Sequence, residues 1–234
     1  MDDLELPQIM HNAVPGYLVA RRPFSWKTLP MMTKRRPYVA TTPQVWALHA
    51  VMPLYLQVSI LLGAVAGLRA AEACGLRPCD VDLALGIIHP AVQYPAEPLK
   101  TAISRTAIPI PPSLSTELLA HQAQFPGPAV LCDLDGHQIG PWRLERVFCA
   151  ARDKVTGLPD RFFYDDLRHF FASVLFASGA DVKKVQARLR HAGARSALGT
   201  DGRLWPDTDE STRASLEAVF IARPEQGQDQ KRAV

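Results

Sequence analysis

The sequence predicts an α+β domain that is mainly α-helical and carries a small antiparallel β-sheet. Apolar residues recur at helical spacing on both sides of residues 80–110, whereas inside that stretch they alternate with polar residues, as in half-buried strands. Glycine and proline punctuate the chain where helices are expected to end. The 234 residues, 47% hydrophobic and 21% charged, suffice for one sizeable core and exclude global disorder.

The first 41 residues are predicted to form an extended basic arm. Prolines punctuate this arm, and each removes a backbone donor and restrains the residue before it. No acidic residue occurs between Leu6 and Ala71, although the whole chain has a net charge of only +3. The basic residues of that stretch are Arg21, Arg22, Lys27, Lys34, Arg35, Arg36 and Arg69. Clustered Lys and Arg favour a polyanionic partner, and a solvated basic linker remains the alternative.

The folded domain is predicted to begin with two apolar helices. Thr42 serves as the N-cap of the first and Pro43 as its first helical residue, and Pro53 interrupts it. The second spans 54–66, and Gly67 is placed to end it. The predicted organisation is an arm over 1–41, a domain over 42–222 and a disordered tail over 223–234.

The middle of the chain is predicted to form the sheet. Alternation over 81–93 predicts strands, and 100–110 predicts a further strand that ends in Pro109 and pairs with them. A short strand is expected over 129–132, before the turn signal Asp135-Gly136. Further helices are predicted over 113–122, 142–155, 170–176, 181–189 and 211–221. Gly179 is expected to end the third of these, and Asp181 to cap the fourth.

Several functions have no support in the sequence. It lacks the glycine-rich phosphate loops, the GxSxG elbow and the HExxH motif, so nucleotide hydrolysis, dinucleotide chemistry, serine hydrolysis and zinc proteolysis are not expected. The four cysteines lack zinc spacing, so we expect reduced thiols in a cytoplasmic protein, no metal and no cofactor. No signal pattern occurs, and no apolar run reaches the ~18–20 residues that cross a bilayer.

Two arginines lie where a fold has little reason to place a charge. Arg69 follows Gly67 among apolar neighbours, where a buried guanidinium requires an anion or carbonyl acceptors. Glu72, three residues on, is a candidate internal partner. Arg168 precedes a very apolar run, and Asp165 lies three residues before it as a candidate ion-pair partner on the same helical face.

Two more cations complete the pattern: His191 at a helix end and Lys100 between strands, which alone would be a capping histidine and a solvated lysine. Together the four resemble, in order and spacing, the tyrosine recombinase or phage integrase family, and the later part resembles integrases of actinobacterial phages. The resemblance covers about residues 42–222. The segments that carry it are 67–77 with 80–82, 100–109, 166–173, 185–192 and 198–213.

The resemblance implies the tyrosine-recombinase catalytic-domain fold and DNA integration without metal or ATP. Arg69 and Arg168 would clamp the non-bridging oxygens of a phosphate, Lys100 would donate a proton, and His191 takes the second histidine-or-tryptophan position. In the family a tyrosine attacks phosphorus and forms a covalent phosphotyrosine link. The expected partners are double-stranded DNA and other recombinase subunits, not a membrane or a small-molecule substrate. The expected DNA contacts are Arg69, Lys100, Arg168, Arg105, Lys34, Arg35 and Arg36.

Three departures from the family pattern qualify this expectation. Asp201 stands at the nucleophilic tyrosine position, and Asp165 stands where the family usually has histidine. Tyr164, the nearest tyrosine by motif, takes a position that is usually an aromatic support. The arm cannot be the helical core-binding domain that usually precedes the catalytic one, which suggests a truncated gene or a fragment.

We therefore expect a domain that presents a basic surface to DNA and does not form the covalent intermediate. Three alternatives remain. The first is a non-catalytic DNA-binding or regulatory recombinase homologue, and the second is a decayed phage remnant whose arginines pair internally. The third is a nuclease in which water replaces the tyrosine.

Overall fold

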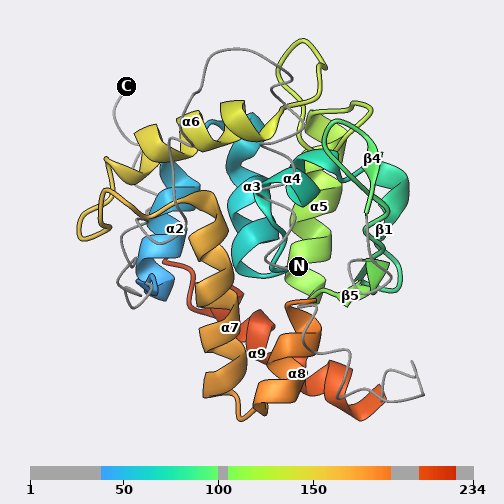
Figure 1. Ribbon diagram of the computed structural model, residues 1–234, viewed down its shortest axis with the longest axis vertical. Helices are drawn as coiled ribbons and strands as arrows, with labels where there is room; N and C mark the ends of the chain where they lie inside the picture. Colours follow the sequence, from blue (N-terminus) through green and yellow to red (C-terminus); the bar gives the residue numbers. More distant parts are fainter. Residues whose placement is uncertain (1–37, 100–104, 191–205, 225–234) are drawn as a thin grey trace, which may run out of the picture. The chain divides into compact units, whose positions relative to one another are not determined.

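Helices predominate in the computed structural model, which describes residues 38–99, 105–190 and 206–224, the side chains of 206–211 excepted. The helices are α2 (Thr42–Val51), α3 (Leu54–Ala64), α4 (Ala70–Gly75), α5 (Pro112–Gln124), α6 (Pro141–Arg152), α7 (Leu167–Ala177), α8 (Val182–Arg188) and α9 (Pro206–Ile221) (Figure 1). The strands are β1 (Val81–Asp82), β2 (Ile87–Ile88), β3 (Val92–Gln93), β4 (Glu97–Pro98) and β5 (Ile108–Pro109). The predicted class, mainly α with a small antiparallel sheet, is confirmed. None of the helices in these ranges has both the length and the apolar character needed to cross a bilayer.

The N-cap of helix α2 lies one residue before the predicted cap. The Thr41 hydroxyl accepts a hydrogen bond from the Gln44 backbone N–H (3.4 Å), and the Gln44 side chain accepts one from the Thr41 N–H (2.9 Å). This reciprocal capping box selects Thr41 over Thr42, because glutamine lies three residues after Thr41. Thr42 is therefore the first helical residue. The predicted break at Pro53 is confirmed, since α3 begins directly after it.

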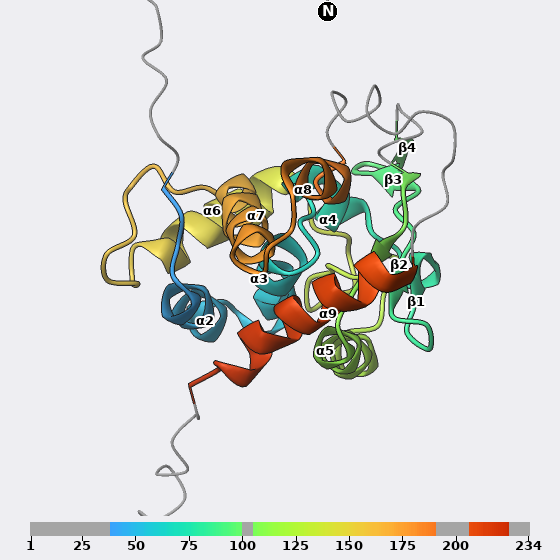
Figure 2. The same cartoon turned by 90° about the horizontal axis from the view of Figure 1, so that it is seen from below.

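Helix α3 forms the centre of the core and is buried along most of its length. It packs against α2, α4, α5 and α7, which surround it in Figure 2. Gly63 makes the approach of α7 possible, because a Cβ atom there would lie 2.8 Å from a Leu167 side-chain carbon. The core therefore holds α3 and α7 close together, and this spacing positions the segments that follow α3 and precede α7.

The turn after α3 depends on Gly67, as the sequence predicts. The helix ends at Ala64, two residues before the predicted end. Gly67 has φ +64°, in the left-handed region that glycine adopts without a Cβ clash. A Cβ atom at this position would also lie 2.8 Å from the ring of Phe171. The turn thus lies directly against α7, and it places the next residues, including Arg69, beside the start of that helix.

The strands form two small sheets instead of the single predicted one. Strands β1, β2 and β5 make an antiparallel sheet in that order, with Ile88 opposite Val81 on one side and Ile108 on the other. Strand β3 pairs only with β4, which the sequence did not predict. The Gln93 carbonyl accepts from the Ala96 N–H (2.8 Å), and this tight turn returns the chain onto β3.

Two predicted strands are wrong in whole or in part. Within the described residues 105–110 of the predicted strand 100–110, only Ile108–Pro109 is strand. Residues 129–132 are bends with a single bridge from Cys132 to Gln138. The Val130 N–H donates instead to the Leu76 carbonyl (2.8 Å), so this backbone bonds to a loop and forms no ladder.

The predicted later helices are all present with shifted ends. Helix α7 begins three residues before its predicted start and α9 five residues before, whereas α6 ends three residues early. The predicted Asp181 cap is confirmed, because its carboxylate accepts from the Lys184 N–H (2.8 Å). Residues 1–37 of the predicted arm, 100–104 of the predicted strand and 225–234 of the predicted tail lie outside the described residues.

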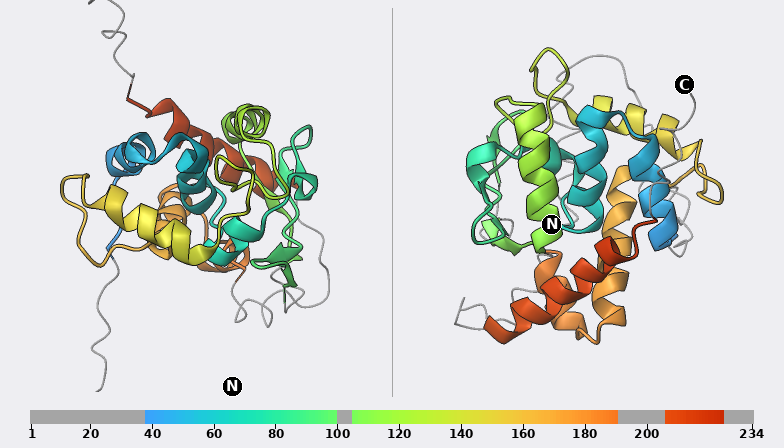
Figure 3. Two further views of the ribbon diagram at one scale, coloured as in Figure 1. Left: turned by 90° about the horizontal axis from the view of Figure 1, so that it is seen from above. Right: turned by 180° about the vertical axis from the view of Figure 1, so that it is seen from behind.

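Helix α9 is docked on helices of its own chain. Figure 3 shows it crossing the molecule in the view from behind, and it contacts α5 and α7. The Trp46 indole of α2 donates to the Val219 carbonyl (2.9 Å), and Arg223 lies over the same indole ring, 4.7 Å from its centre. Arg223 also pairs with Glu117 of α5 (2.7 Å). These contacts bury His49 beside Trp46.

We expect the stability of the domain to fall below neutral pH because of His49. Burial lowers its pKa from 6.5 to about 4, and the nearby Arg223 charge acts in the same direction. The unfolded chain therefore binds the proton first, so stability is complete above pH 6.5 and is lost as pH falls from 6.5 to about 4. The free energy of unfolding, measured with urea, should fall between about pH 7 and about pH 4.5 in both proteins. We expect this fall to be about 2–3 kcal/mol larger in the wild type than in His49→Phe. His137→Gln, at an exposed position, is the control and should behave as the wild type; equal losses in all three proteins would contradict the expectation.

We expect Gly67→Ala to destabilise the domain by about 2–4 kcal/mol, through the left-handed backbone and the clash with Phe171. Gly179→Ala is the matched control. Gly179 also has positive φ, +85°, but a Cβ atom there meets nothing within 4 Å. This control should cost about 1 kcal/mol. Equal losses in the two variants, measured by chemical denaturation, would show that the contact between Gly67 and Phe171 carries no steric constraint.

Candidate functional site

A buried carboxylate, that of Glu72, lies among three arginines. Glu72 is in the first turn of α4 and is 4% exposed. Its Oε2 accepts from Nη2 of Arg190 (2.6 Å) and from the backbone N–H of Arg69 (2.9 Å), and it lies 3.9 Å from Nη1 of Arg168. Its Oε1 lies 3.4 Å from Nη1 of Arg69. One carboxylate is thus shared by three guanidinium groups, which leaves an excess of positive charge.

Arg69 occupies the N-cap position of α4 in extended conformation, directly after the Gly67 turn. The predicted ion pair with Glu72 is confirmed. The pairing is loose, because the side chain of Arg69 is 44% exposed while that of Glu72 is buried. Much of the Arg69 guanidinium therefore stays accessible to a ligand.

Arg168 is buried in the first turn of α7 and bonds mainly to backbone carbonyls. Its Nη1 donates to the Gly67 carbonyl, and its Nη2 donates to the Leu189 carbonyl at the end of α8 (2.7 Å). Burial lowers its pKa to about 10, with the Arg69 charge acting in the same direction, so the group stays protonated at neutral pH. Arg168 therefore joins three segments and retains its positive charge.

The predicted ion pair between Arg168 and Asp165 is wrong. Asp165 lies in a 3₁₀ turn, η4 (Tyr164–Asp166), which precedes α7, so the spacing of an α-helical i, i+3 pair does not apply. Its Oδ1 instead accepts from the Ala70 N–H (2.9 Å). Asp165 thus ties η4 to the beginning of α4, and the carboxylate that pairs with Arg168 is Glu72.

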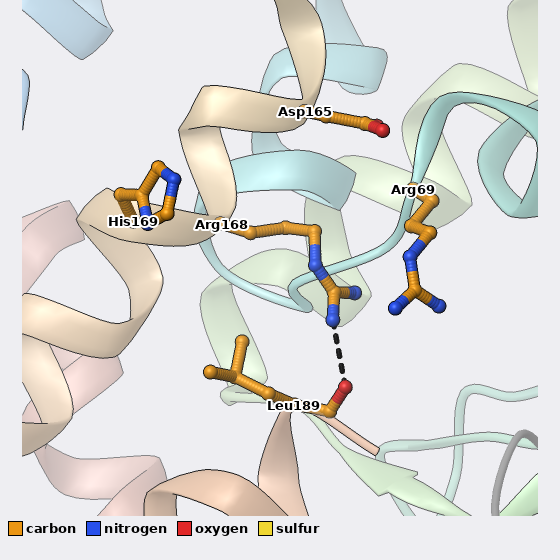
Figure 4. Close-up of a pocket in the computed structure, with 5 residues that line it drawn as sticks. All are labelled: Arg69, Asp165, Arg168, His169 and Leu189. Carbon is orange, nitrogen blue, oxygen red and sulfur yellow. Dashed lines mark hydrogen bonds between the residues drawn. The ribbon is translucent and has the colours of Figure 1, made fainter. Parts of the chain in front are cut away.

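Arg69, Asp165, Arg168, His169 and Leu189 line a pocket of about 260 Å³ (Figure 4). Figure 4 shows the two guanidinium groups extending into the same space, with Asp165 above them. His169 is nearly half exposed and lies 3.8 Å from Asp166. A pocket with two arginine side chains can bind an anion through charge-assisted hydrogen bonds, and their planar donors suit the oxygens of a phosphate group.

The remaining predicted site residues are not part of this pocket as described. Arg105 is exposed and donates from Nε and Nη2 to the Leu99 carbonyl (3.2 and 3.0 Å), so it bonds across the ends of segment 100–104. The other predicted residues lie outside the described part of the chain: Lys34, Arg35, Arg36, Lys100, His191 and Asp201.

Tyr164 is a core residue. It is fully buried, and its hydroxyl donates to the Ser59 carbonyl of α3 (2.7 Å). Burial raises its pKa well above 10, which opposes formation of a nucleophilic phenolate. The aromatic-support interpretation of Tyr164 is therefore confirmed by its packing.

Arg190 is the residue that sequence reasoning missed. It follows α8, lies 118 residues from Glu72 in sequence, and has a buried side chain. Its backbone lies in the left-handed region, φ +54°, which few non-glycine residues adopt. Only its place beside His191 in the segment 185–192, one of those that carry the family resemblance, pointed to it, and nothing local indicated a partner in α4.

One group of side chains in the described ranges could approach a metal ion: Asp133, Asp135 and His137. Asp133 already pairs with Arg143 (2.6 Å), and Asp135 and His137 are exposed. Exposed acidic groups of this kind need no ion, so we assign none.

A family model described as the phage integrase family matches residues 44–197. The Tn1549 transposon integrase, solved in complex with transposon right end DNA, superposes with a TM-score of 0.63 at 17% identity, over 85% of this chain and 71% of that one. XerA recombinase superposes with a TM-score of 0.58 at 17% identity, over 82% of this chain and 67% of that one. A lambda integrase, solved as a dimer bound to a core site, superposes with a TM-score of 0.55 at 17% identity, over 77% of this chain and 66% of that one. No curated protein matches the chain in sequence.

We expect Tyr164→Phe to lower the free energy of unfolding by about 1–2 kcal/mol, because it removes the buried hydrogen bond from the Tyr164 hydroxyl to the Ser59 carbonyl. Binding at the pocket should not change, since Tyr164 does not line it. Tyr38→Phe, which removes an exposed hydroxyl bonded to the Gly157 carbonyl, is the control and should cost less. Urea unfolding and ligand titration of the three proteins decide; altered anion binding by Tyr164→Phe at unchanged stability would contradict the assignment.

Proposed function

Because the chain belongs to the phage integrase family and has the tyrosine recombinase catalytic-domain fold, we propose that it is a site-specific integrase domain that binds duplex DNA without cleaving it. The observation that carries this proposal is the pocket lined by Arg69 and Arg168. The narrower resemblance to integrases of actinobacterial phages stays a prediction.

The charge around the pocket suits one internucleotide phosphate. Among the described residues, three arginines, Arg69, Arg168 and Arg190, face two carboxylates, Glu72 and Asp165, which leaves a net charge of three minus two, or +1. A phosphodiester carries one negative charge and would neutralise the site. Arg69 offers an accessible guanidinium and Arg168 a rigid one, so the pair would bind the non-bridging oxygens.

Two features oppose strand cleavage. Asp201 occupies the position of the nucleophilic tyrosine, and an aspartate cannot form the phosphotyrosine link. None of the tyrosines in the described part of the chain lines the pocket, and Tyr164 is buried in the core. Asp165, in place of a proton-transferring histidine, bonds to the Ala70 amide and puts a carboxylate beside the phosphate. In the terms of this proposal the chain is a pseudoenzyme with catalytic positions Arg69, Lys100, Arg168 and His191.

The partners follow from the same reasoning. The Tn1549 integrase was solved in complex with DNA, and the lambda integrase was solved as a dimer bound to a core site. We extend both properties to this chain as proposals: duplex DNA, with further copies of the chain on it. The Lys and Arg residues of the basic arm and Arg105 would contribute phosphate contacts outside the pocket.

One observation favours the alternative of a decayed remnant. Arg168 is buried and bonded to the Gly67 and Leu189 carbonyls, and all three arginines approach Glu72. A remnant would keep such contacts for stability alone, without affinity for DNA. A regulatory homologue would bind DNA as proposed here.

Binding to duplex DNA should therefore depend on salt and on the pocket. We expect log affinity to fall linearly with log salt, and Arg69→Gln or Arg168→Gln to weaken binding about tenfold. Arg223→Gln, which removes the same charge near Trp46, is the matched control and should change affinity less than threefold. Fluorescence anisotropy with a labelled duplex measures these values. Absence of binding at low salt would favour the remnant.

A suicide substrate that traps covalent protein–DNA adducts tests the absence of cleavage. The wild type should form no adduct, and any adduct would overturn this part of the proposal. The combined variant Asp201→Tyr, Asp165→His restores both family positions, so an adduct from it would show that the rest of the site can still react. Plasmid nicking by the wild type that Arg168→Ala abolishes would instead support hydrolysis by water.

A further inference from the structure

We propose that Arg190 is a positioning residue that occupies the Glu72 carboxylate and so leaves the charge of Arg69 available to a bound phosphate. This inference rests on the proposed function, because it treats the pocket as a phosphate site. It adds a residue that lies outside the pocket lining and acts through Glu72.

The contact between Arg190 and Glu72 is short and buried. Nη2 of Arg190 lies 2.6 Å from Oε2 of Glu72, and the two side chains are 1% and 4% exposed. Burial lowers the pKa of Arg190, and the charge of Glu72 and its hydrogen bond to Arg190 oppose this effect. A buried charge pair with such geometry is lost only at a large cost, because either partner alone would be an uncompensated charge.

The backbone at Arg190 shows that this contact constrains the chain. A residue with a Cβ atom costs about 1 kcal/mol or more in the left-handed region, yet Arg190 adopts φ +54°. In this conformation its side chain turns from the end of α8 back to α4, where it reaches Glu72. The buried charge pair with Glu72 is one contact that offsets this cost.

Arg190 competes with the pocket arginines for one carboxylate. Arg69 reaches only Oε1 of Glu72 with its side chain, at 3.4 Å, and Arg168 lies 3.9 Å from Oε2. Opposite charges attract strongly in a partly buried site, so without Arg190 the Glu72 carboxylate would draw both guanidinium groups inward, even though the Arg69 N–H still donates to Oε2. Because Arg190 holds Oε2, Arg69 stays 44% exposed beside the pocket.

The charge balance gives the same result. In the described part of the site, the five charged groups with Arg190 sum to +1, and without it two arginines would face two carboxylates at a sum of zero. A neutral site has little affinity for a phosphodiester. Arg190 therefore offsets the charge of Glu72, which leaves the charge and the freedom of Arg69 to a bound phosphate.

A double-mutant cycle in DNA binding tests this role. Arg190→Gln removes the charge but retains a side chain with a Cβ atom, so the left-handed backbone at residue 190 costs about the same. We expect this variant to weaken duplex binding about tenfold. Glu72→Gln combined with Arg190→Gln should bind as tightly as Glu72→Gln alone, because a neutral residue 72 no longer needs a counterion. A weaker double variant would overturn the proposal, since Arg190 would then contact DNA itself.

A second cycle provides the matched control. Arg188 is the last residue of α8 and is partly buried; burial and the Arg213 charge lower its pKa to about 10, and Glu72 is not among the causes. Arg188→Gln and Glu72→Gln should therefore have additive effects on affinity. If Glu72→Gln were equally non-additive with Arg188→Gln and with Arg190→Gln, the change in affinity would reflect net charge alone. That result would contradict a specific role for Arg190.

Chemical labelling tests the position of Arg69 without DNA. Phenylglyoxal modifies accessible guanidinium groups, and mass spectrometry can report the rate at Arg69 relative to the exposed Arg161. We expect this ratio to fall at least threefold in Arg190→Gln and to be equal in Glu72→Gln and the double variant. The last comparison holds even where Arg190→Gln alone does not fold, because the double variant leaves neither Glu72 nor Arg190 as a buried charge without its partner. Unchanged labelling would sink the proposal, and a merely structural Arg190 would alter the melting temperature alone.

The two proposals fail in different ways. Absence of duplex binding by the wild type refutes the proposed function, while the labelling of Arg69 still decides the role of Arg190. Normal DNA binding by Arg190→Gln, with unchanged labelling, refutes only the role of Arg190.

Discussion

The arrangement of the site depends on one buried carboxylate. Glu72 lies in the first turn of a helix of only six residues, and through it α4 contacts the start of α7 at Arg168 and the end of α8 at Arg190. Removal of one partner from a buried charge pair costs about 3–5 kcal/mol, far more than a surface pair contributes. The three segments are therefore held in one arrangement by an interaction that none of them could satisfy alone.

The apolar core brings these segments within reach of Glu72. Gly63 allows Leu167 to approach α3, and Gly67 allows Phe171 to lie against the turn that leads to Arg69. The Tyr164 hydroxyl adds a buried hydrogen bond to α3 directly before α7 begins. Close packing of α3 and α7 thus places Arg69 and Arg168 beside the same pocket, and the electrostatic site is a consequence of the helix packing beneath it.

Binding and reaction make separate demands on such a site. Affinity for a phosphate needs accessible cations on a rigid frame, and the exposed Arg69 with the buried Arg168 meets that demand. Strand cleavage also needs a nucleophile and a proton donor at the right atoms, and the family resemblance predicts Asp201 and Asp165 at the positions of the tyrosine and the histidine. A chain can therefore keep the frame and the charge after the reacting groups have changed.

The sequence by itself determined the features that depend on neighbouring residues. The mainly helical class, the Gly67 turn, the Asp181 cap and the family resemblance are all readable from short segments, because caps and periodicity act over one or two turns. The tertiary structure decided the partners of polar groups that the packing brings together from distant parts of the chain. The Val130 amide bonds to Leu76 rather than to a strand, Asp165 bonds to the Ala70 amide rather than to Arg168, and Arg190 reaches Glu72 across 118 residues. A buried charge takes whichever partner the packing brings near, and in this chain those partners lie on elements distant in sequence.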